Sequence, residues 1–369
     1  MLARALRFVA LLLISVTVAD ACPLCAEAAR QLVTVGMQLD SASQVVLAVP
    51  TAGGTRFRVV AVVKGRHAVG DLVAEPVTAA DGAAPSGRGP FLLVGDPSAP
   101  RWSCLGTIPA NEAPWLRQLA ATFEVKGQHA PPGSAANMQA ALAQALSDAG
   151  WRQRVAVVLP HVENTDPLTA QIAWGELARA PYVALEVVRS KIDPATVSGW
   201  LADPRIAPRY ATYTLLLGFV GAPDDATRLE RRIEAAWRAR EAKNLSAMIA
   251  ADLELRGPSR LDWIEAKYFA DRTRTMAEIE AVLLALHVHG DADRTVPRTR
   301  VIQAYRDFIS ERPPMAGFVA PELADWNYWG AAPQYAALLK SKAIPDPASE
   351  FAVVNYLQRA DAARAGSGR

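Results

Sequence analysis

Residues 210–223 read YATYTLLLGFVGAP, and this stretch indicates how most of the chain folds. Its apolar side chains recur at the three- and four-residue spacing that forms one face of an α-helix, at Tyr210, Tyr213, Leu217 and Val220. The G-A-P at residues 221–223 then ends the helix, because proline cannot continue a helix and glycine is common just past a helix end.

The same pattern continues on both sides of this stretch. Upstream, Asp193-Pro194 combines a helix N-cap with a first-turn proline. Downstream, apolar stripes follow one another through residues 229–237, 245–253, 276–286 and 301–309. Helices of about 8 to 18 residues joined by short Pro- and Gly-containing turns indicate stacked helix pairs. Because each helix shows one apolar stripe, we expect a curled solenoid over residues 137–369.

Residues before about position 124 show the pattern of β-strands instead. Short apolar runs at residues 44–49, 55–63, 73–77 and 91–94 are separated by glycine-containing turns, and residues 114–123 then indicate a helix. Several short strands at this spacing indicate a small barrel or sandwich. The sequence therefore predicts an α+β multidomain protein, with a β domain at 22–124, a Pro- and Gly-rich linker at 125–136 and the helical domain at 137–369.

Residues 1–21 have the form of a cleavable signal peptide. Two arginines precede an apolar run at residues 8–18 that is too short to span a bilayer, which needs about 20 apolar residues. A-D-A at residues 19–21 matches a small-x-small cleavage site. We therefore expect a periplasmic or secreted protein with no transmembrane segment in the mature chain. Because Cys22 follows the cleavage site directly, an outer-membrane lipoprotein with a lipid anchor at Cys22 is the alternative.

Composition excludes two classes of protein. The chain is 51% hydrophobic and 21% charged, with a formal net charge of +2. Nucleic-acid binding requires a clustered basic surface, and a disordered chain would be poorer in apolar residues. The 369 residues are therefore predicted to fold into more than one globular unit and to bind no nucleic acid.

The chain has three cysteines, Cys22, Cys25 and Cys104. In an oxidising compartment two of them are expected to form a disulfide, and the sequence does not choose the pairing. A bond from Cys22 or Cys25 to Cys104 would tie the N-terminal segment to the β domain. The alternative is a thiol-redox or metal-binding role for Cys22 and Cys25, although the βαβ context of a thioredoxin-like site is missing.

Several stretches resemble known families. Residues 44–63, 70–77 and 89–95, closing on WSCLGT at 102–107, resemble the netrin/TIMP-like OB-fold module of exported proteins. The helical part resembles HEAT-like repeat domains. Together with residues 203–218, 285–287 and 323–326, the whole is similar to an uncharacterised family of exported bacterial proteins, which implies an architecture and a compartment but no activity.

The TIMP-like resemblance also implies a specific role for Cys22. In metalloprotease inhibitors of that class, a free N-terminal cysteine reaches the catalytic zinc of the protease through its amine and carbonyl. Those inhibitors begin with Cys-x-Cys, whereas this chain has one residue more, in Cys22-Pro23-Leu24-Cys25. A metalloprotease-inhibitor-like module is therefore a further alternative.

His287 and His289 lie just before Gly290, where we expect a helix to end. Residues two apart do not share a helix face, and only Asp291 or Asp293 could add a ligand nearby. A helix C-terminus favours cationic side chains, so the position explains both histidines, and a metal site is the alternative.

Trp326, Tyr328 and Trp329 form an aromatic cluster close to a proline-bounded turn. Such residues commonly cap the core of a solenoid. The alternative is a binding surface for a peptide or carbohydrate, because Trp and Tyr are enriched at binding surfaces.

No catalytic or cofactor motif is present in the sequence. We therefore expect a non-enzymatic exported protein that binds a protein or peptide partner on its helical surface and needs no cofactor. The alternatives are the metal, redox or inhibitor roles centred on Cys22 and Cys25, and an enzyme that lacks a recognisable motif.

Overall fold

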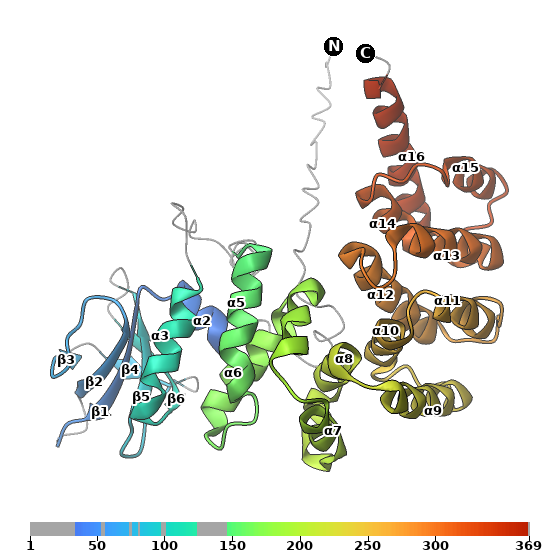
Figure 1. Cartoon of the computed structure of the whole chain (residues 1–369). Coiled ribbons are helices and arrows are strands. Elements are labelled where there is room, and N and C mark those ends of the chain that lie inside the picture. The colour runs from blue at the N-terminus through green and yellow to red at the C-terminus, as the bar shows by residue number, and fades with distance from the viewer. Residues whose placement is uncertain are drawn as a thin grey trace, which may run out of the picture.

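The computed structural model describes residues 34–52, 56–73, 76–79, 82–96, 101–123 and 146–367. Over these residues the protein has an α+β architecture, in which a partly curled six-stranded sheet is followed by a helix-rich region (Figure 1). The predicted order, strands first and helices after, is confirmed. The expected signal peptide and linker lie outside the described residues.

The sheet has the spatial strand order β3-β2-β1-β5-β6-β4. The strands are β1 Gln44–Pro50, β2 Phe57–Lys64, β3 Leu72–Val73, β4 Val77–Thr78, β5 Phe91–Gly95 and β6 Trp102–Thr107. Neighbouring strands are antiparallel except β4 and β6, which are parallel. The single third strand expected at residues 73–77 is wrong. Val73 pairs in β3 with β2, whereas Val77 pairs in β4 with β6, because a local apolar pattern does not determine which partner a strand takes.

The two faces of the sheet bury different cores, as expected from the alternation of side chains along a strand. One face shares a core with helices α2 (Val35–Ser41) and α3 (Ala113–Ala121) and with the helix-rich region, through Val45, Leu47, Leu92 and Val94. The other face forms a smaller cluster that includes Val46, Ala48, Leu93, Trp102 and Cys104. The β and helical regions are therefore joined by one continuous apolar core.

Four buried charged residues, which we call the junction cluster, lie where the sheet meets the first helix pair. They are Asp40 of α2, Arg154 of α5 (Asp148–Val158), and Glu176 and Arg179 of α6 (Pro167–Arg179). Arg154 is fully buried, donates to both carboxylate oxygens of Asp40 at 2.9 Å, and pairs with Glu176. Arg179 donates to Asp40 at 2.6 Å and to Glu176 at 2.8 Å. Each charge thus faces two opposite charges, which offsets the loss of its hydration.

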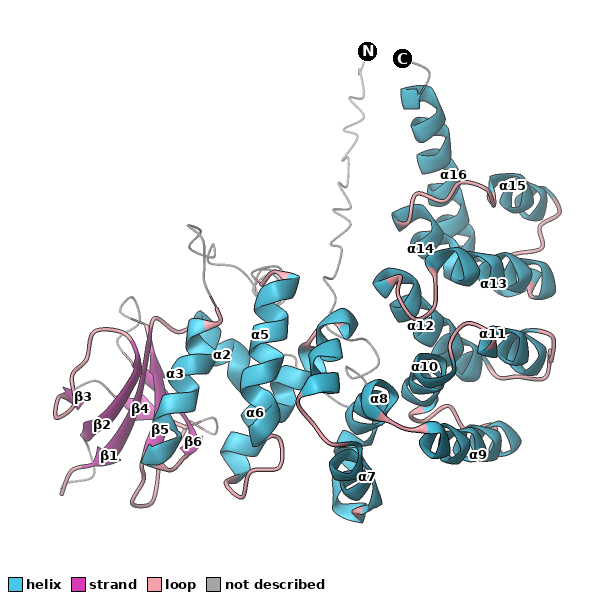
Figure 2. Ribbon diagram, in the orientation of Figure 1, coloured by secondary structure: helices cyan, strands magenta, loops and turns pink. Residues whose placement is uncertain are grey.

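The helix-rich region continues through short turns (Figure 2). Its α-helices are α7 Pro194–Ala202, α8 Tyr210–Val220, α9 Pro223–Ala239, α10 Leu245–Arg256, α11 Arg260–Ile264, α12 Met276–Ala292, α13 Arg298–Glu311, α14 Ala320–Asp325, α15 Ala332–Lys340 and α16 Pro347–Ser367. The 3-10 segments of this region are η2 Leu159–His161, η3 Tyr182–Ser190, η4 Pro204–Arg209 and η6 Pro313–Val319, and η5 Glu265–Phe269 is a π-helical turn. A further 3-10 segment, η1 Ala110–Glu112, lies between β6 and α3.

Local sequence rules place several of these helix ends correctly. Oδ1 of Asp193 accepts a hydrogen bond from the backbone N–H of Ala195 at 2.8 Å, which confirms the predicted N-cap of α7. Helix α8 ends at Val220, and α9 begins at Pro223. These boundaries depend on residues next to each other in the chain, so the sequence alone is sufficient to find them.

Helix α10 lies between α8 and α12 and packs against both (Figure 1). Helices α8 and α10 are buried on all sides. Every residue at 211–219 of α8 and at 245–254 of α10 is buried. The expectation that each helix carries one apolar stripe is therefore wrong for these two. Helix α7 packs against α8, and α9 packs against α10. Segment η3 packs against α8 and α12. It also hydrogen-bonds to α10, because the hydroxyl of Tyr182 donates to Glu254 at 2.9 Å.

Helix α12 does not end at Gly290, as expected, but continues to Ala292. Its C-cap is Asp293, which adopts the left-handed conformation with φ 49°. Gly290 instead allows an aromatic ring to approach the helix, because a Cβ at this position would lie 2.3 Å from Cη2 of Trp326. The glycine therefore reflects a contact with a distant segment and not a helix end.

Candidate functional site

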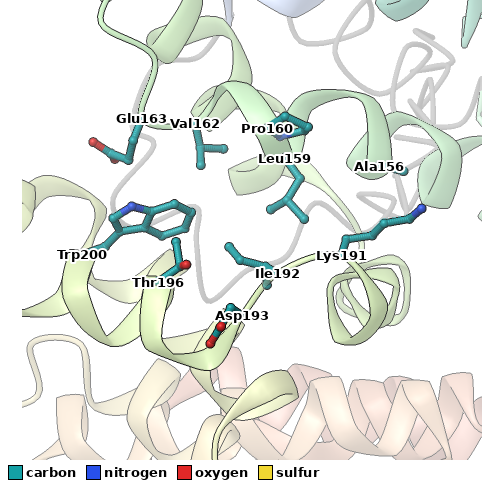
Figure 3. A pocket seen from close by; sticks show the side chains of 10 residues that line it. All are labelled: Ala156, Leu159, Pro160, Val162, Glu163, Lys191, Ile192, Asp193, Thr196 and Trp200. Atoms are coloured by element: carbon teal, nitrogen blue, oxygen red, sulfur yellow. The ribbon is translucent and has the colours of Figure 1, made fainter.

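A cleft lies between the end of α5 and the start of α7 (Figure 3). Its volume is about 380 Å³, within the roughly 300–1,000 Å³ that is typical of ligand pockets. Six apolar residues line it, Ala156, Leu159, Pro160, Val162, Ile192 and Trp200. Four polar residues complete the lining, Glu163, Lys191, Asp193 and Thr196.

Two proline-containing turns position these residues. Pro160 lies in η2, directly after α5, and Pro194 is the first residue of α7. Proline fixes φ and has no backbone N–H, so it is tolerated in the first turn of a helix, where both residues lie. Leu159, Val162 and Ile192 meet across the gap and form an apolar floor (Figure 3).

Trp200 forms an aromatic wall of the cleft. Its indole is only partly buried and packs against Tyr213 of α8, with ring centroids 4.8 Å apart and an angle of 37° between the planes. Tyr213 is itself fully buried. Contact with this fixed ring limits the orientations of Trp200, so the indole presents a defined apolar surface to the cleft.

Glu163 lies beside Trp200 and is held in place by two donors (Figure 3). Its Oε1 accepts from Nη1 of Arg209 at 2.8 Å and from the hydroxyl of Tyr213. Burial, together with the hydrogen bond to Glu163, raises the pKa of Tyr213, so the phenol stays protonated and donates at neutral pH. The charge of Glu163 is therefore largely neutralised by Arg209.

Lys191 lies at the other end of the cleft (Figure 3). Its side chain is exposed, and within the described part of the chain it makes no ion pair or hydrogen bond. Asp193 is two residues away, but its Oδ1 caps α7. The cleft thus combines an apolar floor, an aromatic wall and one cation that is available to a ligand.

Of the three cysteines for which a role was predicted, only Cys104 lies among the described residues. Cys104 is buried in the second face of the sheet and forms no disulfide with any other described residue, and burial raises the pKa of its thiol. A thiol with a raised pKa is a weak nucleophile. Cys22 and Cys25 lie outside the described residues, so the disulfide to Cys104 stays a prediction.

The two histidines considered for metal binding lie in different surroundings. His289 is buried, with Nε2 2.9 Å from the carbonyl oxygen of Ala250 and 3.4 Å from the hydroxyl of Tyr182. His287 instead places Nε2 3.2 Å from Oδ2 of Asp291. Among the described residues, no group of three or more His, Cys, Asp or Glu side chains is arranged to hold a metal ion.

The aromatic cluster takes part in packing between helices. Trp326 stacks on Tyr305 with centroids 5.6 Å apart, and its Nε1 donates to Asp291 at 2.7 Å. Trp329 packs against Tyr356 of α16, whose hydroxyl donates to the carbonyl of Tyr328 at 2.7 Å. These contacts favour the interpretation that Trp326, Tyr328 and Trp329 cap the core.

The cleft does not follow from any local pattern in the sequence. Trp200 belongs to an apolar stripe with Val197, yet Val197 alone is fully buried in α7. The partial exposure of Trp200 depends on where α7 lies relative to α5, which no local pattern encodes. Lys191 has no sequence feature that sets it apart from other exposed lysines. The available signal is Asp193-Pro194, since it marks the start of a helix that carries Trp200 less than two turns later.

The chain matches no family model, no curated protein and no solved structure. Over the described residues, no helix is both long and apolar enough to cross a membrane.

Proposed function

We propose that this is an exported, non-enzymatic protein that binds a peptide segment of a protein partner in the cleft, with the helical array as its scaffold. The observation that carries the proposal is the cleft itself, in which an apolar floor and the Trp200 wall stay accessible beside the free Lys191. Binding sites commonly combine a mostly apolar surface with a few polar groups that fix the orientation of the ligand.

The two carboxylates of the cleft support binding more than catalysis. A general base needs a carboxylate that can accept a proton from a substrate. Oε1 of Glu163 is occupied by Arg209 and Tyr213, and Oδ1 of Asp193 is occupied by the N-terminus of α7. One oxygen of each carboxylate is therefore engaged in holding a wall of the cleft.

Export and the fold types of the two regions have support of their own. The form of residues 1–21 supports export to the periplasm or beyond the cell. The partly curled sheet supports a netrin/TIMP-like OB fold, and the consecutive helix pairs support HEAT-like repeats.

Selection from a displayed random-peptide library on the purified full chain tests the proposal. We expect enriched peptides that carry an apolar side chain and that bind the variant Trp200→Ala about 30-fold more weakly, because truncating an aromatic anchor commonly costs about 2 kcal/mol of binding free energy. The affinity of each peptide is measured by fluorescence anisotropy.

Trp237→Ala is the matched control, since Trp237 is also partly buried but lies on α9 and does not line the cleft. Its affinity for the same peptides should equal that of the wild type. Equal binding by the Trp200→Ala variant, or the absence of any enriched peptide, would contradict the proposal.

A further inference from the structure

The charges of the cleft differ in how much of each is left for a ligand. Glu163 is paired with Arg209, and one oxygen of Asp193 is bound to α7. The ammonium of Lys191 has no side-chain partner within the described residues. Since an exposed charge is satisfied by water until a partner arrives, Lys191 can exchange that water for an anionic group at little cost in free energy.

We infer that Lys191 determines specificity, so that the cleft takes an extended peptide segment with an apolar side chain against Trp200 and an Asp or Glu side chain beside Lys191. This inference rests on the peptide-binding function proposed above. It adds which side chains the peptide carries and in which order they lie along the cleft.

The surrounding backbone favours an acidic side chain over the terminal carboxylate of a peptide. Chain-terminal carboxylates are commonly captured by several free backbone N–H groups. Here the N–H groups of Lys191 and Ile192 both donate to the carbonyl of Val188, at 3.0 and 3.1 Å. The N–H of Ala195 donates to Asp193. An anion at this end is therefore bound by the ammonium group, as in an ordinary side-chain ion pair.

The opposite end of the cleft sets the direction of the peptide. Glu163 lies beside Trp200, and both are distant from the Lys191 ammonium (Figure 3). An acidic group placed beside Trp200 would find no free cation there, because Arg209 is already paired with Glu163. The same acidic group beside Lys191 is attracted. The apolar and acidic side chains of the peptide should therefore occur in a fixed order.

Parallel selections of displayed peptides on the wild type and on Lys191→Glu test this inference. Wild-type peptides should be enriched in Asp or Glu at one fixed offset from the apolar residue, and Lys191→Glu should replace that preference by Lys or Arg. For a wild-type peptide, we expect the affinity for Lys191→Glu to fall about fivefold at low salt and the difference to shrink at high salt. Lys243→Glu, which changes another exposed lysine, should select the wild-type peptides.

Two further arms separate the possible outcomes. Changing the acidic residue of a selected peptide to its amide should weaken binding, and amidating the C-terminus of the peptide should not. If only amidation weakens binding, the terminal carboxylate is recognised and the inference is overturned. If peptides bind through Trp200 without any acidic preference, the inference fails while the proposed function stands. If no peptide is selected, both fail.

Discussion

The junction cluster and the cleft both place charges beside apolar surface, but they leave those charges in opposite states. In the junction cluster, Arg154 is fully buried, and all four charged side chains pair with one another. In the cleft, Lys191 is exposed and pairs with nothing among the described residues. The two sites lie on neighbouring parts of the chain, since α5 carries Arg154 and ends at the cleft.

This difference shows which charges can serve a ligand. A buried charge is tolerated only when its partners satisfy it, so no charge remains for an incoming group. An exposed charge can stay unpaired because water solvates it. A dense group of charges is therefore a weaker sign of function than a single free cation beside an accessible apolar cleft.

The largest effect is expected from breaking the junction cluster. In Arg154→Met, Asp40 and Glu176 each lose a buried partner, and removing one member of a buried ion pair destabilises a protein by about 3–5 kcal/mol. Urea unfolding monitored by circular dichroism measures the free energy of unfolding. Arg152→Met, on the same helix but only partly buried, should change it by less than about 0.5 kcal/mol. Equal losses in the two variants would contradict the assigned role of the cluster.

Two glycine substitutions compare the junction cluster with α7, which borders the cleft. At Gly36 of α2 a Cβ would lie 1.8 Å from Oε1 of Glu176, so Gly36→Ala should lower the free energy of unfolding by about 1–3 kcal/mol. At Gly199 of α7 a Cβ has open space around it, so Gly199→Ala should raise it by about 0.5–1 kcal/mol through helix propensity. Thermal melting should show a lower melting temperature for Gly36→Ala and a higher one for Gly199→Ala. Shifts in the same direction would contradict the difference in space around the two glycines.

The free energy of unfolding should depend on pH through the buried His289, whereas peptide binding in the cleft should not. Burial lowers the pKa of His289 below its usual value of about 6.5, although the carbonyl of Ala250 and the carboxylate of Glu254 oppose this shift. The unfolded chain then binds the proton more readily, so the free energy of unfolding should fall as the pH drops below about 6.5.

The variant His289→Gln removes this titration and provides the control. Denaturant unfolding at pH 7.5 and pH 5.5 should show a smaller difference in this variant than in the wild type. The ten residues of the cleft include no histidine, so the affinity for a selected peptide should change little over the same range. An unchanged pH dependence in His289→Gln would assign the effect to other groups.

The smallest effect on stability is expected from the cleft itself. Lys191→Met removes an exposed side chain that makes no polar contact among the described residues, so the free energy of unfolding should change by less than about 0.5 kcal/mol. Urea unfolding measures it beside Arg154→Met. A loss of more than 1 kcal/mol would show that Lys191 is needed for the fold and is not free for a ligand.

The sequence predicted features that depend on neighbouring residues and missed those that depend on distant ones. Asp193-Pro194 starts α7 as expected, because the cap and the proline act within one turn. Gly290 was misassigned, because the ring that requires a glycine there belongs to Trp326. The strand expected at residues 73–77 was wrong for the same reason, since its two parts pair with strands from different segments.

The candidate site could not be predicted for a related reason. The partial exposure of Trp200 and the free state of Lys191 both follow from where α5, η3 and α7 lie relative to one another, which no local pattern encodes. Buried charges such as Asp40 and Arg154 also look like ordinary surface residues in the sequence, although they are 114 positions apart and in contact.

The position of η3 against the inner helices has a consequence for how the chain folds. Tyr182 contacts His289, 107 positions later, whereas in a simple repeat array each unit contacts only its sequence neighbours. Such distant contacts raise the contact order, which slows folding, and they couple the segments between them into one cooperative unit. During synthesis from the N-terminus, α10 is made before α12, so the face of α10 that packs against α12 stays uncovered until the chain has grown past His289. The incomplete chain therefore exposes apolar surface on α10 that the finished protein buries.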